Sequence, residues 1–218
     1  MRTRICLGAN TAAPRLTLAW MRLFLALELP DGLREAIAAW QRGFDDPALR
    51  PVPAANLHMT LVFLGQRDPH DLDAIAEAAF SRVDSPAPVI EIDPEPVGRP
   101  RGKRPRLFAL QARSPAAGAL QAQVVAGLAD AELNEPRATE SRQRTFWPHL
   151  TVARVRPAKR GSRGPAVVER PPGPVDRTYV CRPTALVRLT LFRSQTRPEG
   201  AVYEPMAELE LPPAETER

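Results

Sequence analysis

The chain has 218 residues, of which 44% are hydrophobic, and it carries a formal net charge of +5 with an isoelectric point near 10.0. This length and composition suffice for one domain, or two packed lobes, around a buried core. The longest apolar runs fall far short of the roughly 20 residues that span a bilayer, which excludes a transmembrane helix. The basic balance favours an anionic partner such as nucleic acid, and two cysteines, Cys6 and Cys181, are too few for a disulfide framework and suit a cytoplasmic protein.

Mixed hydrophobic periodicity along the chain predicts strands and helices in irregular order. Strands are expected at residues 22–29, 57–65, 88–93, 106–112, 149–155, 185–194 and 202–211. Helices with an apolar stripe are expected from residue 31 to about 44, from 71 to about 83 and from 115 to about 133. Because regular βαβ alternation is absent, the pattern favours an α+β fold with antiparallel sheets.

The ends of the chain are expected to lie outside the folded domain. Residues 1–20 contain no continuous apolar stretch, so we interpret them as a disordered extension, or a start codon assigned too early, rather than a secretory signal. A single bilobal domain is expected over residues 21–211, and a flexible tail over residues 212–218. A mobile loop rich in Pro, Gly and Arg is expected over residues 157–174.

Two of the three histidines lie in the same short frame, once in each half of the chain: "NLHMTLVFLG" and "WPHLTVAR". Side chains alternate between the two faces of a strand, so His58 and Thr60 are expected to project together, as are His149 and Thr151. The same alternation assigns Phe63 to the opposite, apolar face. The repeat of the frame indicates two similar lobes that bring the histidines together across a cleft.

Two imidazoles and two hydroxyls suit acid-base chemistry on a phosphodiester. An imidazole with a pKa near 6.5 can take a proton from an attacking water or give one to a leaving oxygen. Threonine hydroxyls and a nearby arginine would stabilise the charge on the non-bridging oxygens. Such a reaction needs no cofactor. Three histidines without a His-Glu-x-x-His frame or paired cysteines also disfavour a metal-dependent hydrolase.

The two frames, with "MRLFLALELP" before them and "LFRSQTRPEGAVYEPM" after them, resemble the 2H phosphoesterase superfamily. Within it, the chain is similar to the RNA 2',3'-cyclic phosphodiesterase branch, also called the 2'-5' RNA ligase family, over about residues 21–211. The resemblance implies a bilobal fold of two antiparallel sheets with flanking helices, a pseudo-twofold duplication and a positively lined central cleft. It also implies hydrolysis of an RNA-terminal 2',3'-cyclic phosphate to a 2'-phosphomonoester. The sequence itself indicates no metal, no membrane and no obligatory protein partner.

By motif position, the resemblance makes His58 the proton donor to the departing 3' oxygen and His149 the proton acceptor that activates water. The residues alone leave these roles interchangeable, because the two frames are alike. Thr60 and Thr151 are expected to bind phosphate oxygens, with Arg154 as the charged clamp. On simple alternation Arg154 lies on the face opposite Thr151, so it reaches the site only through a bulge or a strand end.

Several residues keep two interpretations at this stage. Aromatic residues near the frames either stack on a base or belong to the core: Phe63, Phe146, Trp147 and Tyr203. Arginine-rich groups at residues 99–106 and 154–163 either contact RNA phosphates or form solvated loops. The third histidine, His70, lacks the frame and is expected on the surface. Two alternative functions are a 2'-5' RNA ligase or phosphodiesterase that uses the same histidines, and a non-catalytic RNA-binding module.

Overall fold

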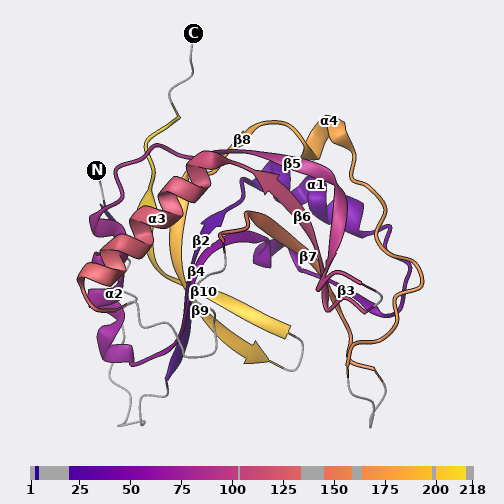
Figure 1. Ribbon diagram of the computed structural model, residues 1–218, viewed down its shortest axis with the longest axis horizontal. Coiled ribbons are helices and arrows are strands. Elements are labelled where there is room, and N and C mark those ends of the chain that lie inside the picture. The colour runs from indigo at the N-terminus through magenta and orange to yellow at the C-terminus, as the bar shows by residue number, and fades with distance from the viewer. Residues whose placement is uncertain are drawn as a thin grey trace.

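Two five-stranded antiparallel sheets form the centre of the molecule (Figure 1). The computed structural model describes residues 3–4, 20–102, 104–133, 145–158, 164–197 and 200–214. In the first sheet the strands lie in the order β1 (Thr3–Arg4), β10 (Gly200–Glu210), β9 (Arg188–Arg197), β2 (Met21–Glu28) and β4 (His58–Arg67). In the second the order is β3 (Leu49–Pro51), β7 (His149–Val155), β6 (Leu107–Arg113), β5 (Val89–Arg99) and β8 (Thr184–Ala185). The expected α+β fold with antiparallel sheets is confirmed.

The topology repeats in the two sheets. In the first, β2 is followed by helix α1 (Asp31–Gln41) and then by β4, which pairs with β2. In the second, β6 is followed by α3 (Pro115–Asp130) and then by β7, which pairs with β6. The strand after the helix, β4 in the first sheet and β7 in the second, begins in each case with a histidine of the His-x-Thr frame. The duplication seen in the sequence is therefore also present in the fold.

Local sequence explains where helix α3 begins and which residues the two long helices bury. Helix α3 starts at Pro115 with Ser114 as its N-cap, because the Ser114 hydroxyl accepts a hydrogen bond from the Ala117 N–H at 3.1 Å. Helix α1 buries Leu33 and Ile37 on one face. Helix α3 buries Leu120, Val124 and Leu128, so both helices follow the predicted apolar stripes.

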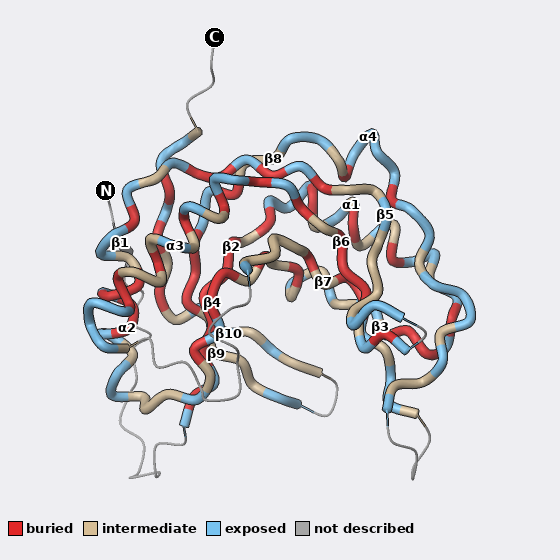
Figure 2. The backbone as a smooth tube through the Cα atoms, viewed as in Figure 1, coloured by how far each residue is buried: buried red, intermediate tan, exposed pale blue. Residues whose placement is uncertain are grey.

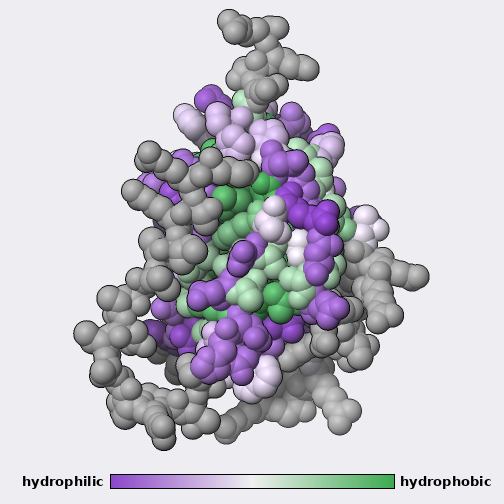
Figure 3. All heavy atoms as spheres, turned by 90° about the vertical axis from the view of Figure 1, so that its left-hand side faces the viewer, coloured by the Kyte–Doolittle hydropathy of each residue, from purple (hydrophilic) through white to green (hydrophobic). Residues whose placement is uncertain are grey.

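A glycine allows close packing of α3 against α2 (Leu72–Ser81). A Cβ atom on Gly127 would lie 2.1 Å from the carbonyl oxygen of Ala78, so no larger residue fits without moving a helix. These two helices cover one side of the first sheet (Figure 1). That side of the surface shows hydrophobic side chains bordered by hydrophilic ones (Figure 3).

The core is continuous from one sheet to the other, as the buried segments in Figure 2 show. Strand β2 is buried on both faces, because Leu23, Phe24 and Leu25 are at most 3% exposed. On β4 and β7 the apolar residues next to the histidines, Met59 and Leu150, are fully buried. Each histidine strand is thus fixed to the core by the residues that alternate with its polar ones.

The structure differs from the sequence prediction mainly in short or extended elements. Strand β5 continues to Arg99, six residues past its predicted end at residue 93. Strands β1, β3 and β8, the helix α4 (Arg177–Val180) and the 3-10 turns η1 (Ala54–Asn56) and η2 (Pro69–Asp71) were not predicted. These elements have two to four residues each, or depend on a distant pairing partner, so local periodicity carries too little signal to indicate them.

The predicted chain ends lie largely outside the described residues. Of residues 1–20, only 3–4 and 20 are described, and Cys6 is not. Of the predicted tail, residues 212–214 are described. Among the helices that the structure describes, none is both long enough and apolar enough to cross a bilayer.

Candidate active site

His58 is the first residue of β4, and its side chain is half-buried beside Thr60. Its Nδ1 atom lies 2.8 Å from the backbone oxygen of Asn56, and its Nε2 atom lies 3.0 Å from the Thr60 hydroxyl oxygen. The ring also contacts Phe24, with centroids 5.0 Å apart, and the edge of Tyr203, at 5.2 Å. The two polar side chains of the frame therefore share a face, as alternation predicts.

His149 has a matching environment at the start of β7. Its Nδ1 atom lies 2.7 Å from the backbone oxygen of Trp147, and its ring stacks on the Trp147 indole with centroids 4.0 Å apart and planes 11° from parallel. The indole Nε1 donates to the side-chain oxygen of Gln111 at 3.3 Å. Thr151 follows on the same face and is half-buried.

The backbone contacts determine which ring nitrogen of each histidine carries the proton. A carbonyl oxygen can only accept, so Nδ1 of His58 donates to Asn56 and Nδ1 of His149 donates to Trp147. In the neutral ring the other nitrogen, Nε2, is then an unprotonated acceptor. For His58 this nitrogen accepts the hydrogen bond of the Thr60 hydroxyl. Each histidine thus presents a basic nitrogen at the same ring position.

The two histidine strands lie side by side where the sheets meet (Figure 1). The pKa of His58 is lowered from 6.5 to about 4, mainly by burial and to a smaller extent by the charges of Arg154 and His149, against the opposite effect of the Asn56 carbonyl. Burial also lowers the pKa of His149, and the Arg99 guanidinium contributes in the same direction. Each imidazole is therefore close to positive charge, and both are neutral near pH 7 without a bound anion.

Arg154 shares a face with Thr151 because β7 contains a bulge. On β6, Ala109 lies opposite Thr151 and Leu107 lies opposite Arg154. The two β6 residues are two positions apart, whereas Thr151 and Arg154 are three positions apart on β7. The extra residue on β7 is Val152, and it shifts the alternation so that Arg154 projects to the same face as Thr151. The bulge on which the predicted role of Arg154 depended is present, and the arginine is exposed and near enough to His58 to affect its pKa.

Phe63 lies on the histidine face of β4, so its predicted position on the apolar face was wrong. The β2–β4 register shifts between Leu25 and Ala26, where two residues of β4 face one of β2. This bulge buries both Leu61 and Val62 and reverses the alternation after them. Phe63 is consequently 68% exposed, with its ring 6.2 Å from that of Phe24.

The other aromatic residues near the frames divide between the site and the core. Trp147 and Tyr203 contact the histidine rings, whereas Phe146 packs against the hydrophobic core. His70 is exposed, which confirms its predicted surface position. Sequence reasoning did not single out Gln111, the partner of the Trp147 indole, since no local pattern connects β6 to a residue two positions before β7.

The arginine-rich groups are only partly described. In the first group, Arg99 places its guanidinium 4.0 Å from the centre of the Trp147 ring, and Arg101, Arg104 and Arg106 are exposed, while Lys103 lies outside the described residues. In the second group, residues 159–163 lie outside them as well. Arg99 is therefore the member of these groups, besides Arg154, that the structure places near a histidine.

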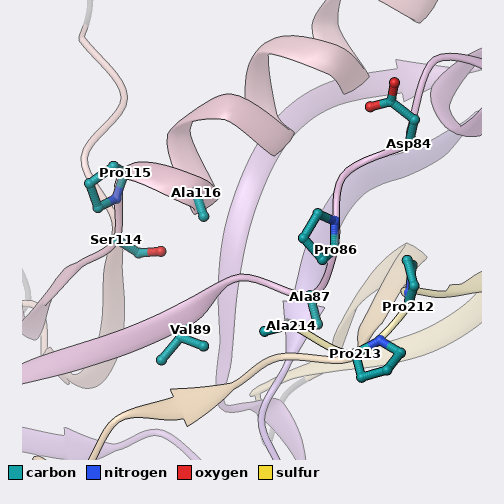
Figure 4. A pocket seen from close by; sticks show the side chains of 10 residues that line it. All are labelled: Asp84, Pro86, Ala87, Val89, Ser114, Pro115, Ala116, Pro212, Pro213 and Ala214. Carbon is teal, nitrogen blue, oxygen red and sulfur yellow. The ribbon is translucent and has the colours of Figure 1, made fainter. Parts of the chain in front are cut away.

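Other parts of the described surface offer no comparable group of reactive side chains. Within the described ranges, no three His, Cys, Asp or Glu side chains are grouped so that they could hold a metal ion. A cavity of about 790 Å³ lies away from the histidines, between the start of α3 and the C-terminal segment (Figure 4). Its lining consists mostly of Pro and Ala, and its one carboxylate, Asp84, accepts a hydrogen bond from Gln123. The histidine pair therefore remains the candidate site.

Comparison with known proteins assigns this chain to a family. Residues 29–180, which include both histidine frames, match the model of the "2'-5' RNA ligase superfamily". The chain belongs to this superfamily. A curated superfamily relative, the RNA 2',3'-cyclic phosphodiesterase of Escherichia coli (strain K12), is 30% identical over 177 residues, which cover 81% of this chain and 91% of the relative.

Solved structures support the same assignment. The protein TT0787 of Thermus thermophilus superimposes with a TM-score of 0.69 at 26% identity, over 88% of this chain and 99% of that one. The apo form of E. coli LigT superimposes with a TM-score of 0.66 at 26% identity, over 88% and 98% of the two chains. The resemblance to the 2'-5' RNA ligase family, expected from the two frames, is confirmed. Since its curated relative is an RNA 2',3'-cyclic phosphodiesterase and LigT has the same fold, the chain is an enzyme of this superfamily.

Proposed function

We propose that the chain hydrolyses the 2',3'-cyclic phosphate end of RNA to a 2'-phosphomonoester, with His58 and His149 as general acid and base and without a metal ion. The observation that carries the proposal is the matched placement of the two imidazoles, each held by a backbone carbonyl at Nδ1 with Nε2 unprotonated. Relatives support the substrate class. The E. coli and Methanocaldococcus jannaschii relatives are named RNA 2',3'-cyclic phosphodiesterase, and LigT has been crystallised with 3'-AMP and with phosphate.

In the attacking step, His149 Nε2 accepts a proton from water while the water oxygen bonds to phosphorus. The neutral state of His149 suits this role, because burial keeps the pKa of the imidazole below 6.5. The stacked Trp147 indole and the carbonyl contact at 2.7 Å fix the ring plane, so that Nε2 keeps one direction.

In the leaving step, the bond between phosphorus and the 3' oxygen breaks, and His58 gives the proton on Nε2 to that oxygen. His58 must be protonated first, whereas burial keeps its pKa near 4 in the free protein. A bound phosphate supplies the missing counter-charge, since an anion beside an imidazolium raises its pKa. Substrate binding thus prepares the acid, and proton exchange with solvent restores both rings after turnover.

The non-bridging oxygens need donors, which Thr60, Thr151 and Arg154 provide in this proposal. In the free protein the Thr60 hydroxyl is bound to His58 Nε2, so it must turn toward the phosphate when that nitrogen gains its proton. Arg154 adds a permanent charge on the same face as Thr151. The family's ligase activity would be the reverse of a similar reaction at the same groups.

The test is product analysis of a short RNA that ends in a 2',3'-cyclic phosphate, incubated in EDTA with wild type and with His149→Ala. We expect a 2'-phosphomonoester from wild type and almost none from the variant. Activity that EDTA abolishes would contradict the metal-free mechanism. If neither wild type nor His149→Ala hydrolyses this RNA, but both bind it and the binding persists in His58→Ala, the protein would be the non-catalytic RNA-binding module instead. If the protein hydrolyses 2'-5' linked RNA but not the 2',3'-cyclic phosphate, its substrate would be the 2'-5' linkage.

A further inference from the structure

Arg99 is connected to His149 through a single aromatic ring. It is the last residue of β5, and its guanidinium carbon lies 4.0 Å from the centre of the Trp147 ring, within cation–π distance. Trp147 in turn stacks on His149 at 4.0 Å. The indole therefore contacts both the guanidinium and the imidazole, and holds the guanidinium at a defined position one ring away from His149.

Strand register places Arg99 in the same row as Arg154. Arg99 lies opposite Leu107 on β6, and Leu107 lies opposite Arg154 on β7. Opposed residues of antiparallel strands project to the same face, so both arginines lie on the face that carries Thr151. With neighbouring strands about 4.8 Å apart, the two backbone positions are about 10 Å apart across the sheet, whose three strands adjoin in Figure 1.

The Arg99 guanidinium has an unfilled hydrogen-bond position. Its Nε atom is buried and has no acceptor in the part of the chain that the structure describes. A buried charged donor without an acceptor is unfavourable and is rare in folded proteins. An anionic oxygen supplied by a ligand would satisfy it, and the planar guanidinium matches the geometry of phosphate oxygens.

The proposed reaction leaves this second cation without a function. A cyclic phosphodiester carries a single negative charge, for which Arg154 and the two threonines are sufficient donors. Arg99 acts on the other histidine, since its charge lowers the pKa of His149, whereas Arg154 acts on His58. Two guanidiniums lie in one row of the sheet, and each is near enough to one imidazole to lower its pKa, so the pair matches a ligand with two phosphates.

We propose that Arg99 forms a second phosphate subsite, which binds the phosphate on the 5' side of the terminal nucleotide. This inference rests on the proposed function and specifies its substrate: a nucleotide whose 5' oxygen carries a phosphate, as in an RNA strand, in preference to a cyclic nucleoside phosphate with a free 5' hydroxyl. Trp147 is then the support of Arg99 as well as of His149.

The experiment compares adenosine 2',3'-cyclic phosphate with and without a 5'-phosphate. We expect the kcat/KM of wild type to be about tenfold higher for the 5'-phosphorylated compound, and this ratio to fall toward one in Arg99→Gln. The ratio cancels any effect of the substitution on Trp147 or His149 that both substrates share. Arg101→Gln removes the same charge from an exposed position two residues away and should keep the wild-type ratio.

Product binding gives a second readout that needs no turnover. Adenosine 2',5'-bisphosphate should bind wild type more tightly than adenosine 2'-phosphate in calorimetry, and Arg99→Gln should remove the difference. A wild-type ratio of one, an unchanged ratio in Arg99→Gln, or an equal loss in Arg101→Gln would each overturn the subsite. If neither cyclic compound is hydrolysed while the binding difference persists and depends on Arg99, the proposed function fails and the subsite stands.

Discussion

Thr151 and Arg154 share one face of β7 although three positions separate them, because the intervening bulge leaves Val152 without an opposed residue on β6. The carbonyl of Val152 is held from the other side, by the side-chain amide of Gln41 at 2.7 Å and the backbone N–H of Val52 at 2.9 Å. Helix α1 thereby stabilises the irregularity that brings the arginine to the histidines.

Arg154→Gln is expected to lower kcat/KM for an RNA 2',3'-cyclic phosphate by about 100-fold, because a charged donor to the transition-state oxygens is lost. The fold should persist, since the Arg154 side chain is exposed. Steady-state kinetics with Arg42→Gln, an exposed arginine at the end of α1, provides the control. Equal losses in the two variants would argue against a specific role of Arg154.

His58→Ala and His149→Ala are each expected to lose about 10²- to 10⁴-fold in kcat, the usual contribution of a general acid or base. Circular dichroism should show an unchanged fold, because both rings are only half-buried. His70→Ala removes the exposed third histidine and should be as active as wild type. Unfolding of either site variant would instead indicate that the histidines belong to the core.

The pH profile of kcat/KM, which reports the free protein, is expected to be bell-shaped with limbs that belong to the pair of histidines jointly. Burial lowers the pKa of both rings below 6.5, so the singly protonated pair is most populated on the acidic side of that value. Activity should therefore fall as pH rises above 6.5. In kcat the falling limb should move to higher pH, because bound phosphate raises the pKa of the acid. A profile with one limb would contradict the assignment.

Asp46→Asn should reduce the free energy of unfolding by about 1–3 kcal/mol in thermal or urea unfolding. The buried carboxylate of Asp46 accepts backbone N–H groups from Ala48, Glu169 and Arg170 at 2.7–2.8 Å, and the Arg170 N–H does most to lower its pKa. These contacts favour the ionised carboxylate, which lowers its pKa and stabilises the fold at pH values above the unfolded-state pKa of 3.8. This contribution is lost as the pH falls from 3.8 through the lower pKa of the folded state.

Asp45→Asn is the matched control for this prediction. The exposed Asp45 carboxylate pairs with Arg170 at 3.2 Å on the surface, where an ion pair contributes little. A loss of stability as large as that of Asp46→Asn would show that surface charge, rather than the backbone contacts, holds the segment around residue 170.

Gly127→Ala is expected to destabilise the fold by more than 1 kcal/mol, since its Cβ atom would lie 2.1 Å from the Ala78 carbonyl oxygen. Gly118→Ala in the same helix should raise the free energy of unfolding by about 0.5–1 kcal/mol, because the nearest atom is 4.0 Å away and alanine favours the helix. Chemical denaturation measures the free energy of unfolding of both variants. Changes of the same sign and size in Gly127→Ala and Gly118→Ala would contradict the close packing of α2 and α3.

The sequence by itself determined the histidine and threonine pairs of the site. His58 and Thr60 share a face because two residues of one strand are related by local backbone geometry alone, and the apolar residues between them specify which face is buried. The same reasoning holds for His149 and Thr151, and hydrophobic periodicity was enough to place the long strands and helices.

Only the tertiary structure decided what lies around these pairs. The bulges that turn Phe63 and Arg154 toward the histidines arise where strands of unequal residue count are matched, a long-range effect that alternation within one strand cannot express. The stacking of Arg99 on Trp147 joins residues 48 positions apart in sequence (147 − 99 = 48), on segments brought together by the second sheet. The lowered pKa values depend on the burial that the assembled sheets create, because charge and desolvation act through space rather than along the chain.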